Sequence, residues 1–468
     1  MKIRIKNIVV CCIALIAIAN TTKAQTQAAA FKVPAYEKFL LPNGLTIYLM
    51  EQHEVPTISF SAILPAGAIY DGQKSGLASL TASGLQYGTK SYSKSKIEEK
   101  LDFIGAQLNT YATKESAGLS AKFAGKDQDL VLPILKEVLA DPIFNEEEFA
   151  KEQKRVLAGL EQAKESPRAV IGSYWDHFLF GDHVYGNSVS GSPATVGKFN
   201  VNDLKAFYKA NYSPSGSAIA VVGDFDTKQM KAKLSKLFNG WKKSDQAQQN
   251  KAAQPVAALT TNRVLLVNKE DARETTFLIG GLGVRRDNPD YVSLQVVNTV
   301  FGGRFTSWLN DELRVNSGLT YGANSRFTPL KNSGTFAIST FTATKTTEPT
   351  IDKALEVLKK LHEKGIDDET LASAKNYVKG QFPPNYETSE QLADLMTQMF
   401  WYGFNESYIN NFQSNVDGMT SAKAKEIVNK YYPKDKLQFI LIGKSEDIKK
   451  IAAKYGPVTE KQIKADGF

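Results

Sequence analysis

The chain has 468 residues, of which 23% are charged, and a formal net charge of +8 at pH 7. One hydrophobic core rarely serves so many residues, so two or three domains are expected. The first 24 residues carry four basic and no acidic side chains, and setting them aside lowers the charge to +4, which is too small to indicate nucleic-acid binding.

Residues 1–24 have the pattern of a secretory signal peptide. A basic start, MKIRIKN, precedes an uninterrupted apolar run, IVVCCIALIAIA, and a small residue, Ala24, lies at the expected cleavage point. The alternative, a membrane anchor, is disfavoured because a membrane span needs roughly 18–20 apolar residues and this run is shorter. No other stretch approaches that length, so we expect an exported, periplasmic protein with no transmembrane segment in its mature chain.

Both cysteines, Cys11 and Cys12, lie in this leader. The mature chain can therefore form no disulfide and bind no metal through thiolate. Neither cysteine lies at the cleavage point, where a lipid-anchoring cysteine would be found.

Strand and helix patterns alternate along the mature chain. Apolar and β-branched residues between turn residues predict strands at 45–52, 57–67 and 117–125. Helical spacing of apolar residues predicts helices at 94–105, 129–141 and 145–163. Asn145 is the expected N-cap of the last of these helices. Long helices beside a mainly antiparallel sheet indicate an α+β fold class.

Three pairs of segments indicate that the chain is an internal duplication. YSPSGSAIAVVGDF begins at Tyr212 and YPKDKLQFILIGKS at Tyr432, and each has a Gly at the same distance from its Tyr. ESPRAVIGSYWDHFLFG and ETSEQLADLMTQMFWYG begin at Glu165 and Glu387, and ILKEVLADPIF and VLKKLHEKGID have nearly the same spacing. The agreement of three offsets predicts two halves of about 220 residues, each an α/β sandwich whose mainly antiparallel sheet is covered by helices.

The predicted domain boundaries follow from this duplication. The first half is 25–241, a polar, Gln- and Ala-rich linker is 242–262, and the second half is 263–468. The aromatic segment MFWYGFN repeats HFLFGDH of the first half, so it is expected to be core rather than a binding site.

Several segments, in this order, resemble the pitrilysin/insulinase family of zinc metallopeptidases, and most closely its two-domain, mitochondrial-processing-peptidase-like branch. LPNGLTIYL is similar to the opening strand of the family, and GLASLTASGLQYGTKSYS to its G-x-A-H-x-x-E-H helix. GDHVYGNSVSG, YSPSGSAIAVVGDF and FGGRFTSWLNDELRVNSGLTYGANS are similar to three later blocks. The resemblance implies a clamshell of two peptidase-like domains.

The sequence departs from the family at every zinc position. The two His and the Glu of the H-x-x-E-H motif, which bind the metal and activate water, correspond to Ser79, Ser83 and Ala82. The third ligand of the family, a Glu on a later helix, corresponds to Gly159, although a supporting carboxylate is present at Glu152. The resemblance therefore implies that this chain binds no zinc and is inactive alone.

Other catalytic centres find little support in the sequence. The chain has four histidines, His53, His177, His183 and His362, and their spacing does not place two on one helical face, so we expect structural roles. A serine nucleophile is disfavoured because GLAS is not a G-x-S-x-G elbow and no base can be nominated.

Arg314 and Tyr321 match the Arg and Tyr of a family block in the second half. The resemblance implies that they lie across the chamber from the metal and contact the substrate carbonyl. A guanidinium and a phenol hydroxyl are fixed donors suited to a developing oxyanion. From spacing alone, an Arg in a surface ion pair and a Tyr in the core would be favoured.

The pattern is that of the non-catalytic subunit of a heterodimeric zinc endopeptidase. Such a subunit supplies Arg and Tyr to a zinc-bearing homologous partner that acts on peptides or unfolded polypeptides, so zinc is expected in the partner. Extended substrates would add a strand to a sheet edge. The alternative is a peptide-binding or scaffold component of a cell-envelope assembly without a role in proteolysis, because fold does not fix function.

Overall fold

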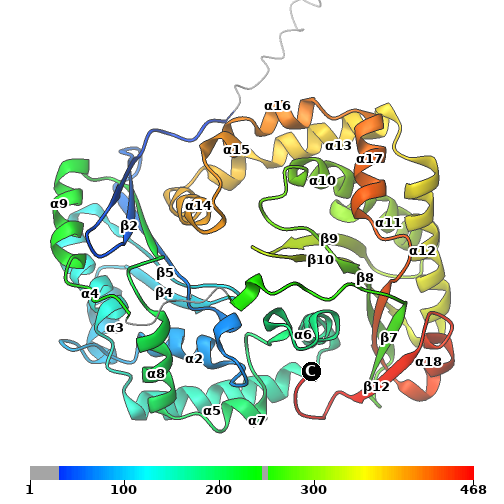
Figure 1. The fold of residues 1–468 in the computed structure, drawn as a ribbon, viewed down its shortest axis with the longest axis horizontal. Helices are drawn as coiled ribbons and strands as arrows, with labels where there is room; N and C mark the ends of the chain where they lie inside the picture. The colour runs from blue at the N-terminus through cyan, green and yellow to red at the C-terminus, as the bar shows by residue number, and fades with distance from the viewer. Residues whose placement is uncertain (1–30, 245–250) are drawn as a thin grey trace, which may run out of the picture.

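The computed structural model describes residues 31–244 and 251–468, so the predicted leader and part of the predicted linker lie outside the described residues. Within them the chain forms two six-stranded sheets with helices packed on them (Figure 1). The first sheet is built from residues 37–223 and the second from residues 263–462. The expected α+β class with two similarly built halves is confirmed.

The first sheet has the strand order β1-β2-β6-β3-β5-β4. Its strands are β1 (Glu37–Leu40), β2 (Thr46–Glu51), β3 (Thr57–Leu64), β4 (Gln107–Ala112), β5 (Ala117–Ala124) and β6 (Ala218–Gly223). The β2–β6 pair is parallel and the other pairs are antiparallel. β2 and β6 are buried along almost their whole length, as expected for strands covered on both faces.

The second sheet repeats this layout in the order β12-β7-β11-β8-β10-β9. Its strands are β7 (Arg263–Asn268), β8 (Glu274–Leu282), β9 (Ala323–Pro329), β10 (Gly334–Ala343), β11 (Gln438–Gly443) and β12 (Val458–Gln462). β7 runs parallel to both of its neighbours, β11 and β12, and the remaining pairs are antiparallel. The repeated segments that begin at Tyr212 and Tyr432 form β6 and β11, and each of these strands lies near the centre of its sheet.

Amphipathic helices cover the outer faces of the sheets. The three helices expected from periodicity are present as α3 (Lys94–Phe103), α4 (Gln128–Ala140) and α5 (Glu146–Ala163). Asn145 caps α5 as expected, since its side chain accepts a hydrogen bond of 3.0 Å from the Glu148 N–H. The other long helices include α8 (Val201–Asn211), α9 (Thr227–Phe238), α10 (Tyr291–Asn298), α12 (Thr347–Lys364), α13 (Asp368–Gln381), α17 (Ser421–Tyr431) and α18 (Ser445–Ala452).

Two further helices are exchanged between the halves. α6 (Pro167–Phe180) belongs to the first half in sequence but packs on β8 and β11 of the second sheet. α14 (Ser389–Tyr402) belongs to the second half but packs on β3 and β6 of the first sheet (Figure 1). These helices lie in the two repeated segments that begin at Glu165 and Glu387. Each half therefore contributes the same repeated helix to the sheet of the other half.

A buried polar contact joins the two halves. The Glu115 carboxylate, in the β4–β5 turn, accepts hydrogen bonds of 3.0 and 3.1 Å from the Lys331 N–H in the β9–β10 turn, and another from the Tyr185 hydroxyl. The Lys331 ammonium lies 4.5 Å from the Trp401 ring centroid on α14. Burial raises the pKa of Glu115 and lowers the pKa of Lys331. The corresponding turns of the two sheets thus meet.

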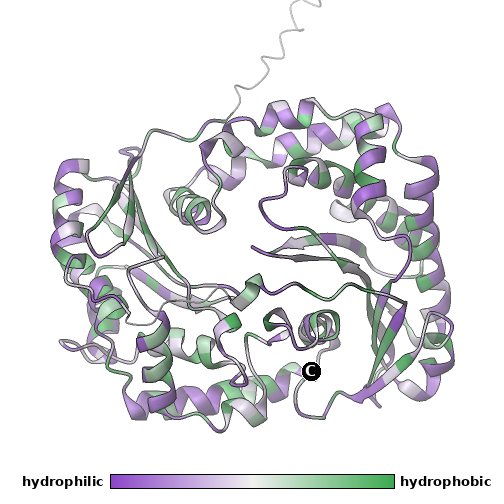
Figure 2. Ribbon diagram, viewed as in Figure 1, coloured by the Kyte–Doolittle hydropathy of each residue, from purple (hydrophilic) through white to green (hydrophobic). Residues whose placement is uncertain are grey.

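The distribution of hydrophobic residues agrees with this arrangement of sheets and covering helices. Figure 2 shows hydrophobic strands inside and mixed purple and green segments along the outer helices. None of the helices in residues 31–244 and 251–468 is both long enough and apolar enough to cross a lipid bilayer.

Candidate functional site

Helix α2 (Leu77–Gly84) carries three of the four predicted zinc positions. The Asp71 carboxylate fixes the start of α2 by accepting hydrogen bonds of 2.9 and 2.8 Å from the N–H groups of Gly76 and Ala78. Gly76 has a φ of +96°, and an added Cβ would lie only 2.9 Å from the Gly191 Cα. Only glycine therefore fits at this position without strain.

The α2 side chains offer no metal ligand. Ser79 and Ser83 lie one turn apart on the same face and are half-buried, whereas Ala82 is fully buried. Their two hydroxyls and one methyl group cannot replace two imidazoles and a carboxylate around Zn²⁺. The helix is retained, packed on α8 and β4, without the groups that would bind zinc.

The fourth predicted position, Gly159, is exposed on α5, and an added Cβ there would meet nothing within 4 Å. The Glu152 carboxylate, two turns earlier, accepts a hydrogen bond of 2.7 Å from Arg155 Nε and is already paired. The Tyr87 hydroxyl is buried, with no hydrogen-bond partner in the described part of the chain. Burial, with a smaller contribution from the Glu152 charge, raises the pKa of Tyr87.

The zinc that the family resemblance implies does not fit these residues. Residues 31–244 and 251–468 contain no group of three or more His, Cys, Asp or Glu side chains that could hold a metal ion. His53 bridges Glu51 and Asp224 at 2.8 and 2.6 Å on the surface, and His183 accepts a hydrogen bond from the Tyr185 N–H. These two histidines have structural partners, as the sequence predicted for all four.

Arg314 and Tyr321 lie together, in contact. Arg314 is on the π-helical turn η6 (Asp311–Asn316), and Tyr321 lies in the loop before β9. The guanidinium carbon of Arg314 is 4.5 Å from the Tyr321 ring centroid and 4.8 Å from the Phe305 ring centroid. Tyr321 is 75% exposed, so it is not a core residue. Arg314 forms no ion pair within the described residues, so the surface ion pair that spacing alone favoured is not found.

Buried polar residues hold this pair in place. The Asn310 side chain, 4% exposed, donates a hydrogen bond of 2.7 Å to the Phe305 carbonyl and accepts one of 3.3 Å from the Ala323 N–H. The Thr340 hydroxyl on β10 donates to Thr320 Oγ1 at 3.0 Å. These contacts fix the loops that carry the two aromatic rings in contact with Arg314. Asn310 and Phe305 were not predicted from the sequence, although both lie within the segment FGGRFTSWLNDELRVNSGLTYGANS that resembles the family.

The surroundings of Arg314 are unusually apolar for a surface. Phe305 and Val315 are each 65% exposed, beside the exposed Tyr321. Single exposed apolar residues are ordinary, but a cluster around a cation marks a contact surface. This cluster presents the donors of a guanidinium and a phenol beside apolar surface.

Two protein-family models match this chain. A model described as insulinase, peptidase family M16, matches residues 47–191, and a model described as the peptidase M16 inactive domain matches residues 198–378. The chain belongs to peptidase family M16. The first match contains all four substituted zinc positions of this M16 protein, and the second contains Arg314 and Tyr321.

Its relatives include proteins named as peptidases and one named as a non-peptidase. An uncharacterized zinc protease of Rickettsia felis is 24% identical over 72% of this chain and 81% of its own length. A probable mitochondrial-processing peptidase subunit beta of Arabidopsis thaliana is 21% identical over 87% of this chain and 78% of its own. A non-peptidase homolog of Helicobacter pylori, YmxG, is 24% identical over 80% of this chain and 89% of its own.

Solved M16 structures share the fold. A structure titled peptidase M16 inactive domain, from Pseudomonas fluorescens, has a TM-score of 0.81 at 24% identity, covering 88% of this chain and 98% of that one. A structure titled a protease from Helicobacter pylori has a TM-score of 0.80 at 19% identity, covering 88% and 100%. The two-half fold is therefore that of M16 proteins, and the zinc positions set this chain apart from the catalytic pattern of the family.

Proposed function

We propose that this chain is the non-catalytic subunit of a heterodimeric zinc endopeptidase that acts on peptides or unfolded polypeptides. The observation that carries the proposal is the contact between the half-buried Arg314 and the exposed Tyr321 in a chain whose zinc positions are Ser79, Ala82, Ser83 and Gly159. A pseudoenzyme that serves only as a scaffold has no need to present two fixed donors in this way.

The chemistry of the pair suits a shared site. The zinc of the partner subunit would polarise the scissile carbonyl, and this chain would add donors to the same oxygen. The Arg314 guanidinium and the Tyr321 hydroxyl are available for this, because neither group has a hydrogen-bonding partner in the described part of the chain. Phe305, whose ring centroid lies 4.8 Å from the guanidinium carbon, restricts the guanidinium further and reduces the entropy lost on binding.

The names of two relatives support a multi-subunit role. One relative is named as the beta subunit of a mitochondrial-processing peptidase and another, from Bos taurus, as subunit 1 of the cytochrome b-c1 complex. Both names place an M16 chain within a larger assembly. The predicted leader supports an assembly outside the cytoplasm, in the periplasm.

The decisive experiment is reconstitution with a zinc-bearing homologue from the same genome, one that keeps H-x-x-E-H. The two chains are co-expressed and co-purified, and the cleavage of an unstructured peptide and the zinc content are measured for each chain and for the pair. The proposal expects one zinc per pair, located in the partner, and cleavage by the pair only. A stable pair whose cleavage rate equals that of the partner alone would contradict it.

A scaffold role in a cell-envelope assembly is the second candidate. The Helicobacter pylori relative is named a non-peptidase homolog, which favours an M16 chain kept for its shape. This role predicts a stable complex with envelope proteins and no dependence of any cleavage on Tyr321. A neighbouring gene encoding an H-x-x-E-H protein would favour the peptidase role instead.

A further inference from the structure

A cavity of about 410 Å³ lies wholly within the second half, away from α2. It is lined by residues of α10, β9, α13, η8 (Pro383–Tyr386), α15 (Glu406–Asn410) and α16 (Phe412–Asp417). Its lining includes two cations, Arg286 and Arg326, and no Asp or Glu among the described residues. The cavity is therefore positively charged and has a volume typical of small-ligand sites.

Arg286 is held by aromatic rings rather than by an acid. Its guanidinium carbon lies 4.5 Å from the Tyr291 ring centroid, 4.8 Å from that of Tyr408 and 4.9 Å from that of Phe404. Its Nη1 is buried, with no hydrogen-bond partner among residues 31–244 and 251–468. The neighbouring Arg285, in contrast, donates two hydrogen bonds, of 3.0 and 2.7 Å, to Asp287. A buried, charged donor without an acceptor is costly, and an anion would satisfy it.

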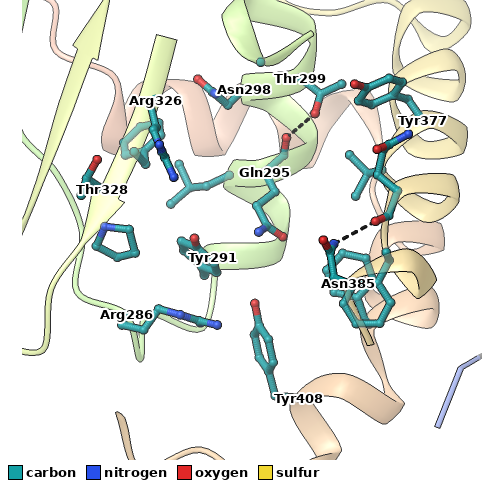
Figure 3. Close-up of a pocket in the computed structure, with 18 of the residues that line it drawn as sticks. Arg286, Tyr291, Gln295, Asn298, Thr299, Arg326, Thr328, Tyr377, Asn385 and Tyr408 are labelled. Carbon is teal, nitrogen blue, oxygen red and sulfur yellow. Dashed lines mark hydrogen bonds between the residues drawn. The ribbon is translucent and has the colours of Figure 1, made fainter. Parts of the chain in front are cut away.

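A second buried polar atom faces the same space. Gln295 Oε1, on α10, is also buried without a hydrogen-bond partner in the described chain. Figure 3 shows the Arg286 guanidinium, the Gln295 amide and the Tyr408 hydroxyl pointing toward a common space. Burial raises the pKa of Tyr408 to about 12, so its hydroxyl stays protonated and can donate. The cavity thus offers donors to an anion and one acceptor to an N–H group.

One further part of the wall is aromatic. Phe382 and Phe412 stack on each other, with ring centroids 3.6 Å apart, and Tyr386 packs edge-on against Phe382 at 4.9 Å. All three line the cavity. An apolar side chain next to the anion would therefore find a hydrophobic surface, while the anion itself remains on the Arg286 side.

We propose that this cavity is a binding site for a peptide carboxylate. The carboxylate accepts hydrogen bonds from Arg286 and Tyr408, a backbone N–H of the peptide donates to Gln295 Oε1, and an adjacent apolar side chain packs on Phe382 and Phe412. The carboxylate comes either from the C-terminus of the peptide or from an acidic side chain. The inference rests on the proposed function for its substrate class, peptides, but needs no zinc-bearing partner.

Calorimetric titration of the isolated, full-length mature chain tests the site with three peptides. These are N-acetyl-Leu-Phe with a free carboxylate, the same peptide as its C-terminal amide, and N-acetyl-Asp-Phe amide. The free acid should bind at least tenfold more tightly than its amide, since hydrogen bonds to charged groups dominate the recognition. Binding of the Asp peptide in place of the free acid would assign the site to acidic side chains. Equal affinity for all three peptides, or no binding at millimolar concentration, would overturn the proposal.

Two adjacent arginines provide a matched pair of variants. Arg286→Gln should weaken acid binding by about 10- to 100-fold, whereas Arg285→Gln, which removes the same charge at the adjacent position, should leave it unchanged. Tyr408→Phe removes one hydroxyl and Gln295→Leu removes one amide group at a similar side-chain volume, so these two variants test the site if Arg286→Gln does not fold. Wild-type affinity in all the folded cavity variants would exclude the site.

The outcomes also separate this site from the proposed function. The titration uses one chain and no catalysis, so a failure to bind carboxylates leaves the shared protease site untouched. Conversely, if the chain binds the free acid through Arg286 but supports no cleavage with any partner, the carboxylate site is supported and the peptidase role is excluded.

Discussion

The guanidinium carbon of Arg314 lies 4.5 Å from the ring centroid of Tyr321, seven residues later in the chain, and both side chains remain accessible. A π-helical turn carries the first residue and a loop fixed by Asn310 carries the second. Two donors that would otherwise move independently are therefore presented as one unit. The first two predictions below follow from this pairing.

Tyr321→Phe removes one hydroxyl from an exposed ring and should leave the stability of the chain unchanged. In the reconstituted pair, the loss of one oxyanion donor is expected to lower kcat by about 10²–10³. Steady-state cleavage of a peptide, with assembly checked by size-exclusion chromatography, measures the effect. An intact pair with unchanged kcat would show that the hydroxyl does not contact the reacting carbonyl.

Arg314→Ala removes a substrate anchor as well as a donor, and it is expected to raise KM in addition to lowering kcat. Arg285→Ala is the matched control, because Arg285 is an exposed arginine of the same half paired only with Asp287. The control should cleave as the wild type does. Equal effects of both variants would indicate a general loss of positive charge rather than a specific contact.

The zinc positions can be tested by restoring them. The quadruple variant Ser79→His, Ala82→Glu, Ser83→His and Gly159→Glu is expected to bind zinc weakly, while the wild-type chain binds none in stoichiometric amount. The missing groups that would orient the ligands are expected to cost about 10–100-fold in affinity. Elemental analysis after dialysis measures the zinc content. A folded quadruple variant without zinc would show that these are not the metal positions.

Alanine substitutions at Gly76 and at Gly159 should change the stability of the chain in opposite directions. Gly76→Ala introduces a Cβ 2.9 Å from the Gly191 Cα at a φ of +96° and is expected to destabilise the chain by about 2–4 kcal/mol. Gly159→Ala, exposed within α5 with nothing within 4 Å, is expected to stabilise it by about 0.5–1 kcal/mol. Denaturant unfolding of both variants measures the difference. Equal stabilities would show that the start of α2 is not as tightly packed as its geometry indicates.

The contact at Glu115 predicts a pH dependence of stability. Burial raises the pKa of Glu115 above its ordinary value of 4.5, so in the window above 4.5 the folded chain binds more protons than the unfolded one. The free energy of unfolding contributed by this group therefore falls as pH rises through that window. Glu115→Gln should flatten this slope while keeping an acceptor for the Lys331 N–H. Unfolding curves at several pH values test the prediction, and an unchanged slope in the variant would contradict it.

Much of the fold could be predicted because periodicity reports burial directly. β2, β3, β5, α3, α4 and α5 lie where alternation or helical spacing placed them, apart from small shifts at their ends. The packing partner of a helix could not be predicted in the same way, because periodicity shows which face of a helix is apolar but not which element covers that face. The sequence therefore did not predict that α6 packs on the second sheet. Its sequence, with Val170, Tyr174, Trp175 and Phe180 buried, is apolar on several sides, and that is the signal of a helix enclosed between layers.

The candidate site residues were also only partly predictable from the sequence. Family resemblance placed Arg314 and Tyr321, but only the fold shows their contact and the support from Asn310. The carboxylate cavity had no signal in the sequence, because Arg286, Gln295 and Tyr408 fit no motif and the last of them is far along the chain. MFWYGFN was expected to be core. Trp401 is buried, but Phe404 packs on the Arg286 guanidinium, so the segment also supports a cation.

The exchange of α6 and α14 has a consequence for how the chain reaches its native state. The last strand of the first sheet, β6, is made before the midpoint of the chain, but the helix that covers the inner face of that sheet, α14, is synthesised much later. Until then β3 and β6 present apolar residues to solvent, in a state prone to aggregation. Neither half can complete its core alone, so the chain should fold late and as one unit, and a chaperone that shields the first sheet until α14 has been made would favour its recovery.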